Sequence, residues 1–166
     1  MKKYEFTGET KEIVLYGKKV TLHRIKAVIE FGLIKAGEVG GWIEKESNLS
    51  HDNKSWVWGN AEVWGDAKVW GNAEVCGNAK VWGDAKVWGD AKVWGNAEVF
   101  QMDHILVIGP AGSRNDFTTF FRDADNEITV KCGCFLGKID KFLEKVTQTH
   151  KDNKYAVVYR AAVELA

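Results

Sequence analysis

The middle of the chain is a six-residue repeat, and no other feature restricts the possible folds as strongly. From Val57 to Glu98 the sequence reads VWGNAE VWGDAK VWGNAE VCGNAK VWGDAK VWGDAK VWGNAE, which is seven successive hexads, and Val99 and Phe100 begin an eighth. Self-similarity at a fixed short period indicates a repetitive architecture in which each unit packs on its neighbours. We therefore predict a solenoid over this segment.

Each hexad predicts a short strand followed by a corner. Ala, Glu or Lys, Val and Trp supply four extended residues, and the Gly-(Asn/Asp) pair tolerates left-handed backbone at little steric cost. Side chains alternate across a strand, so Ala and Val share one face while Trp shares the other with the charged residue. The charged residues need water and a narrow coil has no room for three indoles, so we predict Val and Ala inside and Trp outside.

The repeat continues upstream in degraded form. The Ala position is occupied there by Ser55, Leu49 and Ile43, and the Val position reaches Val39, so the solenoid would span residues 39–100 and contain ten hexads. The pattern resembles the hexapeptide repeat of left-handed parallel β-helices, in which an aliphatic residue and, four places on, a small residue recur every sixth position. The resemblance implies three hexads, or eighteen residues, per coil and therefore about three coils.

An eighteen-residue coil places residues eighteen positions apart side by side. Opposite charges on adjacent strands are stabilising by a few tenths of a kcal/mol, about 0.2–1 at most. Three of the four charged neighbours are then opposite in sign, namely Glu62/Lys80, Lys80/Glu98 and Glu74/Lys92, and one pair, Lys68/Lys86, is alike. The charge pattern therefore favours this coil length.

The same stacking arranges the outward aromatic side chains in columns. These are Trp58/Cys76/Trp94, Trp64/Trp82/Phe100 and Trp70/Trp88. Even two adjacent indoles approach the size of an apolar patch that marks an interaction surface, so the six tryptophans are candidate interface residues of a homo-oligomer. Two alternatives stay open: the rings cover one another and neighbouring lysine stems without any partner, or they are platforms for carbohydrate.

Residues 1–38 predict a β-rich cap. Their alternating apolar positions indicate strands at Tyr4–Thr7, Glu12–Tyr16 and Val20–Ile29, with a turn at Gly17–Lys19. A coil end exposes unpaired backbone, which repeat proteins cover with a cap.

Residues 101–166 predict a C-terminal α+β module of ββ-β-α-α order. The expected strands are His104–Ile108, Asp116–Arg122 and Glu127–Phe135. Two helices follow from apolar positions with helical spacing, Ile139, Phe142, Leu143 and Val146 in the first and Tyr155, Val158, Tyr159 and Ala162 in the second. The whole chain is thus predicted to be mainly β.

The loop between the first two strands of this module is the one candidate binding site. It reads GPAGSRND, and its candidate ligand-binding residues are Gly112, Ser113, Arg114, Asn115 and Thr118. Backbone amides freed by glycine, a hydroxyl and a guanidinium suit a phosphate or a carboxylate, and Phe120 or Tyr155 could stack on a base. The loop is neither a Walker loop nor a G-x-G-x-x-G fingerprint. An equally simple alternative is a plain strand connection in which Arg114 pairs with Asp116 or Asp123.

The cysteines and histidines give weaker signals. Cys132 and Cys134 would lie on the same side of one strand, and with His104 and His150 they could form a metal site, but a single C-x-C lacks a partner motif. We interpret both cysteines as small buried hydrophobes in reduced form and His150 as a cation at a helix end. We expect no metal and no cofactor.

The segment 22–100 resembles the opening and the repeats of many proteins carried by phages and prophages. The shared elements are L-x-R-I-x-A, K-A-G-x-x-G-G-W and N-L-S-H ahead of the hexads, and the tail, with GSRNDFTTFF and VKCGCFLGKIDKF, also resembles a module appended to such repeats. The resemblance implies a phage or prophage origin and no assigned chemistry. No apolar run approaches the ~20 residues of a spanning helix, and the start lacks the apolar core of a signal peptide, so we expect a cytoplasmic protein of an infected bacterial host.

Charge and motif content exclude several functions. Lys plus Arg (23) equals Asp plus Glu (23), which argues against nucleic acid and membrane as partners, and no Ser-His-Asp or paired-carboxylate arrangement is recognisable, which argues against an enzyme. The first hypothesis is therefore an oligomeric binding protein that sequesters a small phosphorylated ligand, such as a host defence nucleotide signal. The alternative is a structural scaffold whose tryptophan columns bind sister chains or a host defence protein.

Overall fold

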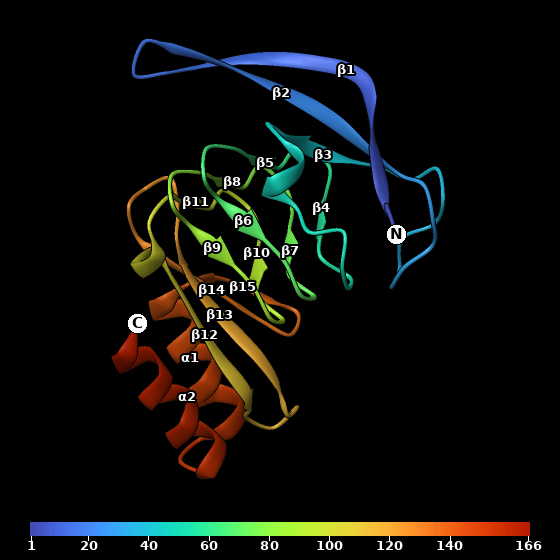
Figure 1. The fold of residues 1–166 in the computed structure, drawn as a ribbon. Coiled ribbons are helices and arrows are strands. Elements are labelled where there is room, and N and C mark those ends of the chain that lie inside the picture. Colours follow the sequence, from blue (N-terminus) through green and yellow to red (C-terminus); the bar gives the residue numbers. More distant parts are fainter.

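The computed structural model describes all 166 residues. The chain forms, in order, a long N-terminal hairpin, a β-solenoid of about three turns, and a four-stranded sheet with two helices (Figure 1). The hairpin projects over one side of the solenoid, and the C-terminal part lies at its far end. None of the helices combines the length and the hydropathy that a membrane crossing requires.

Strands make up most of the regular structure. The first are β1 (Tyr4–Leu15), β2 (Lys18–Ala27) and β3 (Val39–Ile43). The repeats contribute two-residue strands: β4 (Trp56–Val57), β5 (Glu62–Val63), β6 (Lys68–Val69), β7 (Glu74–Val75), β8 (Lys80–Val81), β9 (Lys86–Val87), β10 (Lys92–Val93) and β11 (Glu98–Val99). The C-terminal elements are β12 (Ile105–Ala111), β13 (Asp116–Arg122), β14 (Ile128–Cys132), β15 (Phe135–Lys138), α1 (Ile139–His150) and α2 (Lys154–Leu165). Two 3-10 helices, Glu46–Asn48 and Met102–His104, complete the set.

The repeat strands form three parallel sheets, one on each side of the coil. Their orders are β3-β5-β8-β11, β4-β7-β10 and β6-β9. Within the hexads, paired residues are eighteen positions apart, as Val63 and Val81 are in one sheet and Val75 and Val93 in another. This register confirms the predicted coil of three hexads.

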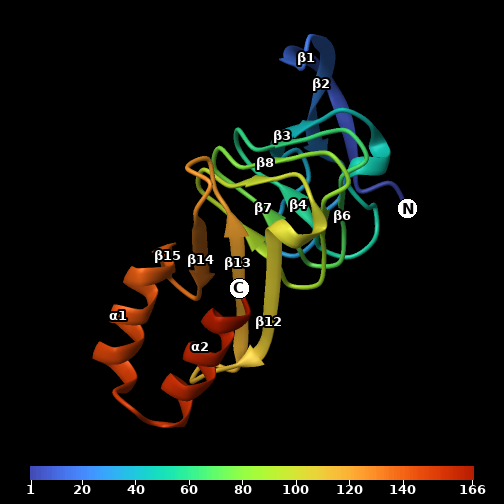
Figure 2. The ribbon, with the colours of Figure 1, turned by 90° about the vertical axis from the view of Figure 1, so that its left-hand side faces the viewer.

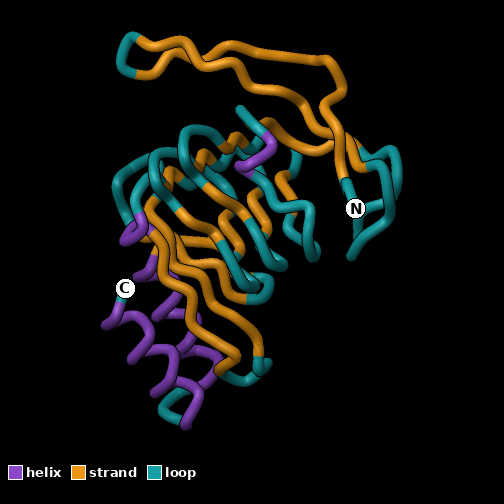
Figure 3. The backbone as a smooth tube through the Cα atoms, viewed as in Figure 1, coloured by secondary structure: helices purple, strands orange, loops and turns teal.

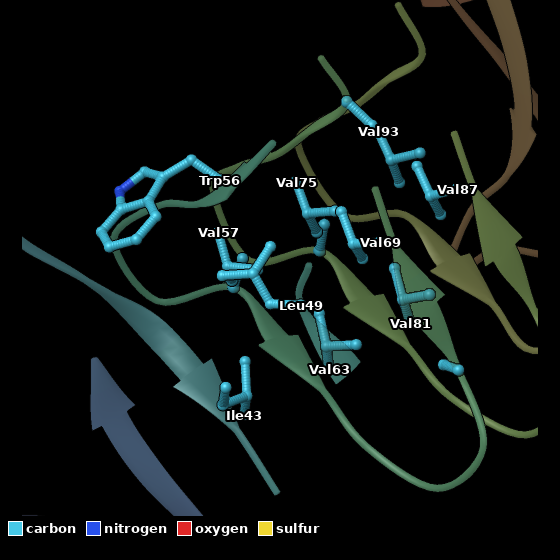
Figure 4. Packing of buried hydrophobic residues seen from close by; sticks show 14 of the residues in the cluster. Ile43, Leu49, Trp56, Val57, Val63, Val69, Val75, Val81, Val87 and Val93 are labelled. Atoms are coloured by element: carbon cyan, nitrogen blue, oxygen red, sulfur yellow. The ribbon is translucent and has the colours of Figure 1, made fainter. Parts of the chain in front are cut away.

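The interior of the solenoid consists of aliphatic side chains from successive coils. The repeat valines and alanines have at most 1% of their surface exposed, and valines from successive rungs stack along the axis (Figure 4). The corners stack as loops around this core (Figure 3), and every repeat glycine from Gly59 to Gly95 has a φ between 56° and 79°. The inward-facing valine and alanine therefore agree with the prediction.

The first coil departs from the predicted phase. Leu49 pairs with Val69 and Ile43 with Val63, which are twenty rather than eighteen residues away. Both therefore occupy the valine position, and the prediction that they occupy the alanine position was wrong. The corner after Leu49 holds two additional residues, so the phase shifts there. For the same reason the valine position does not reach Val39, which is 48% exposed.

The N-terminal segment extends the first solenoid sheet. β1 and β2 form an antiparallel hairpin, and β2 pairs antiparallel with β3, for example through His23 and Ile43. The predicted strands 4–7 and 12–16 are one strand with a register shift between Phe6 and Thr10. Tyr4, Ile25, Ala27 and Ile34 of this segment belong to the same core cluster as the valines. The N-terminal segment thus closes the first coil.

The C-terminal sheet closes the opposite end of the solenoid. Its order is β12-β13-β14-β15, all antiparallel. Ile105 and Phe121 join the core of the solenoid, whereas Phe120 and Val130 on the other face pack against α1 and α2. The solenoid and the two helices therefore lie on opposite faces of the sheet (Figure 2).

Three details of this part differ from the prediction. The expected strand 127–135 is two strands, because the chain turns at Gly133 with a φ of 55°. Cys132 and Cys134 consequently flank a turn instead of sharing one face of a strand. In α2 the exposed Val158 is not a core residue, and Ala156 is buried in the helix interface instead.

Candidate functional site

The candidate site lies at the end of the β12–β13 hairpin. Because β12 continues to Ala111, the connection consists only of Gly112–Asn115. Gly112 has a φ of 71°, and a Cβ atom there would lie 2.0 Å from the phenol oxygen of Tyr159. Glycine is therefore required at this position both by the backbone and by the close approach of α2.

The two helices bring polar side chains to this turn. Ser113 Oγ lies 3.5 Å from Nε2 of His150, the last residue of α1. The His150 ring centroid is 5.7 Å from that of Tyr159 and 5.8 Å from that of Tyr155. Burial and, to a smaller extent, the neighbouring Cys132 raise the pKa of Tyr159 above its ordinary value. We call this group, together with Arg114, the module tip.

Arg114 is exposed, and its guanidinium has no ion-pair or hydrogen-bond partner. It passes beside Gly133, since a Cβ atom there would lie 3.2 Å from its Nη1. The two acidic residues that could have paired with it are engaged elsewhere: Asp116 accepts a hydrogen bond from the adjacent backbone, and Asp123 accepts one from Lys138 Nζ at 2.6 Å. The structure therefore does not contain the arginine pairing of the plain strand connection.

Asp123 itself has a structural role. Burial alone would raise its pKa, but hydrogen bonds from Lys138, from Thr129 and from two backbone N–H groups outweigh that effect and hold the pKa below its ordinary value. The carboxylate is thereby kept ionised at the turn between β13 and β14.

The remaining residues that were predicted to bind a ligand differ in how exposed their side chains are. Asn115 is exposed, with a φ of 49°. Thr118 is only 4% exposed, and its Oγ1 donates a hydrogen bond to Cys132 Sγ at 3.2 Å, so it supports the tip from beneath. Phe120 is buried in the core and cannot stack on a ligand. Ligand binding by Gly112–Asn115 stays a prediction.

Sequence reasoning identified the loop but missed the residues that the helices add. Tyr159 was predicted as a helix core residue, and His150 as a cation near a helix end or a candidate metal ligand, and neither was predicted to lie at the loop. Residues 113 and 150 come together because α1 runs back along the sheet (Figure 2). The spacing of residues in the sequence does not indicate this proximity.

The tryptophan columns form as predicted. The rings of Trp64 and Trp82 are parallel with centroids 5.0 Å apart, Phe100 stacks below Trp82 at 4.8 Å, and Trp70 stacks on Trp88 at 5.7 Å. Trp58 and Trp94 are separated by Cys76. A role in an interface stays a prediction for all six tryptophans.

The columns differ in how much of them is covered. Leu22 of the hairpin packs on Trp42 and Trp64, and the apolar residues near the hairpin tip extend this cover toward Trp82. Trp64 keeps only 4% of its surface exposed, whereas Trp88 keeps 41%. The hairpin thus leaves the Trp70/Trp88 column as the more open one.

No protein-family model matches this sequence, and no curated protein matches it. The class of protein is therefore given by the fold alone: a β-solenoid of about three turns that is closed at its C-terminal end by an α/β module.

Proposed function

We propose that this chain is a non-enzymatic binding protein that sequesters a small phosphorylated ligand at the module tip. One observation carries the proposal: Arg114 is an exposed guanidinium without a partner, next to the Ser113–His150 pair. An arginine without an ion-pair partner is available for an external anion, and a phosphate would satisfy two of its N–H groups at once.

The neighbouring groups fit such a ligand. The Ser113 hydroxyl and the His150 imidazole can donate hydrogen bonds to further phosphate oxygens. Tyr155 is half-buried beside His150 and offers a ring face on which a base can stack. A nucleotide would therefore use the charged side of the tip for its phosphate and the aromatic side for its base.

Binding accounts for the tip better than catalysis does. A serine next to a histidine is a nucleophile beside a base, but the 3.5 Å separation is at the limit of a hydrogen bond. The other neighbours of His150 are the rings of Tyr155 and Tyr159, and no carboxylate orients the imidazole. A protein that only sequesters a ligand needs affinity for it and does not need an oriented imidazole.

The wider proposal includes origin and assembly. We propose a left-handed coil, a phage or prophage source, and a cytoplasmic role in an infected bacterium. Capture of a host defence nucleotide there would lower the concentration of the free signal. Self-association would raise the number of sites per particle. These points are supported by the repeat pattern and the phage-like opening of the sequence.

The test is a thermal shift screen of the purified full chain against mononucleotides and cyclic dinucleotides. A ligand present at a hundred times its Kd should raise the Tm by about 5–10 °C. Arg114→Ala should abolish the shift. Arg160→Ala is the matched control, because this arginine of the same module is already paired with Asp152 at 2.9 Å. If no nucleotide shifts the Tm, or if both variants respond like the wild type, the proposal is wrong.

A second candidate function is a scaffold that binds sister chains or a host protein through the Trp70/Trp88 column. The 41% exposure of Trp88 favours it. Trp88→Ser should reduce the mass of the particle measured by light scattering. Tyr16→Ser, which removes another exposed aromatic ring, is the control. An unchanged mass in both variants would leave the column without a role in self-association.

A further inference from the structure

A cleft of about 370 Å³ opens on the side of the solenoid formed by β4, β7 and β10. We call it the open-face cleft. All three parts of the chain contribute to it: Leu33 from the N-terminal segment, the solenoid wall, and Asp116 from β13. Its volume lies within the range of small-molecule sites, and the module tip shares no residue with it.

The repeat places the side chains of this cleft in register. Glu74 and Lys92 are paired positions of β7 and β10. Lys54, Asn72 and Asp90 lie eighteen residues apart along one corner, where Asn72 Nδ2 donates a hydrogen bond to Asp90 Oδ1 at 3.1 Å. The next corner contributes the half-buried indole of Trp58.

The charges around the cleft are mixed in sign and unpaired. Two ammonium groups and three carboxylates line it, and none of the five forms a salt bridge within 4.0 Å; they are Lys54, Lys92, Glu74, Asp90 and Asp116. Elsewhere on the solenoid, repeat charges do pair: Glu62 lies 2.6 Å from Lys11, and Lys80 lies 3.7 Å from Glu98. Hydrogen-bonding capacity of both kinds is therefore open to a ligand in this cleft.

We infer that the open-face cleft binds a neutral saccharide of one or two rings. A hydroxyl donates to a carboxylate and accepts from an ammonium group, so an uncharged sugar can satisfy both signs of charge together. An anion or a cation would instead meet like charge on part of the wall. The indole of Trp58 supplies the flat apolar surface on which the C–H face of a pyranose rests.

This site is independent of the module tip. The two ligands differ in charge, and no residue serves both sites. Failure of phosphate binding at Arg114 therefore leaves the saccharide inference standing, and the reverse also holds.

The test is saturation-transfer NMR with the full chain and five probes: glucose, galactose, N-acetylglucosamine, maltose and lactose. At least one probe should receive saturation from the protein. Asp90→Asn keeps the shape and the hydrogen bond to Asn72 but removes the charge, and Lys92→Gln removes the ammonium group. Each should raise the Kd of that probe about tenfold or more, because a hydrogen bond to a charged group is lost.

The repeat itself supplies matched controls. Asp84 and Lys86 occupy the same hexad positions as Asp90 and Lys92 but lie outside the cleft. Asp84→Asn and Lys86→Gln should leave the Kd unchanged. The inference is overturned if no probe receives saturation, or if the control variants weaken binding as much as the cleft variants do. It is also overturned if glucose 6-phosphate binds more tightly than glucose and Asp90→Asn leaves the Kd of glucose 6-phosphate unchanged.

Discussion

Two sides of the solenoid carry the same repeat and yet present different surfaces. The covered face, formed by β3, β5, β8 and β11, lies beside the hairpin, which packs on Trp64. The open face, formed by β4, β7 and β10, carries a cleft that a turn of the N-terminal segment and the start of β13 help to line. The contrast is clearest in two identical hexads, VWGNAE, which end at Glu62 and Glu74.

A repeat position acquires its role from the segment that lies next to it. Glu62 is paired with Lys11 of the hairpin at 2.6 Å and keeps little exposed surface, whereas Glu74 has no ion pair and lines a cleft. Likewise, Trp64 beside β5 is a buried packing residue, whereas Trp88 beside β9, on the third side of the coil, is exposed. The flanking segments therefore give a uniform repeat one side that the hairpin covers and two sides that the hairpin leaves uncovered.

The largest effect is expected from two tryptophans on different sides of the coil, Trp64 beneath the hairpin and Trp88 beside β9 on the third side. Trp64→Ala should lower the free energy of unfolding by about 3 kcal/mol, because it leaves a cavity beneath the hairpin. Trp88→Ala removes a ring that is 41% exposed and should cost less than about 1 kcal/mol. Urea denaturation followed by circular dichroism measures both. Equal losses would mean that the hairpin does not protect the covered face.

A second test uses Lys3, which lies beside β4 at the N-terminal end of the open face. Its ammonium group is buried, donates to the Ser55 carbonyl at 2.7 Å and lies 5.0 Å from the Phe31 ring centroid, with no carboxylate bonded to it. Burial lowers the pKa of Lys3 to about 8, although Asp52 opposes the shift. Between this value and the ordinary 10.5, the unfolded chain therefore holds a proton that the folded chain has released.

The free energy of unfolding should accordingly gain a positive contribution from Lys3 as the pH rises from about 8 toward 10.5. Lys3→Met should reduce that rise, measured by urea denaturation at several pH values. The control is Lys2→Met, because Lys2 is exposed and paired with Glu46 at 2.6 Å. An unchanged pH dependence in Lys3→Met would show that Lys3 keeps its proton as an exposed lysine does.

The smallest effect is expected from the two equivalent glutamates. Glu62→Gln breaks a half-buried ion pair and should cost about 0.5–1 kcal/mol, with the loss shrinking at high salt. Glu74→Gln should be close to neutral, since no cation is paired with it. Thermal unfolding at low and high ionic strength distinguishes the two. A larger loss of stability in Glu74→Gln than in Glu62→Gln would contradict the conclusion that Glu74 has no ion-pair partner.

Sequence patterns predicted the regular parts well and the irregular parts poorly. The inward valines, the eighteen-residue register and the stacked indoles all follow from one repeated hexad. The same preference for a short strand and a corner recurs in every copy, which makes the pattern easy to recognise. Leu49 and Ile43 were assigned to the alanine position instead of the valine position because both residues are apolar and fit either inward position. The two-residue insertion that separates them from the regular hexads has no signature of its own.

The candidate site shows the same limit. The loop residues Ser113 and Arg114 were recognisable as donors from their types alone. The unpaired state of Arg114, and the arrival of His150 beside Ser113, depend on how α1 and α2 return along the sheet. The open-face cleft escaped prediction entirely, because it joins residues from segments as distant as Leu33 and Asp116.

The shape of each rung follows from local sequence, because alternation along a strand and the φ preference of glycine act within a few residues and need no distant partner. Packing between distant segments sets which side of the coil is covered, which charges are paired, and which polar groups meet at the module tip. Those outcomes depend on the placement of the hairpin and the C-terminal sheet, and burial and pairing are energies between segments that are far apart in the chain.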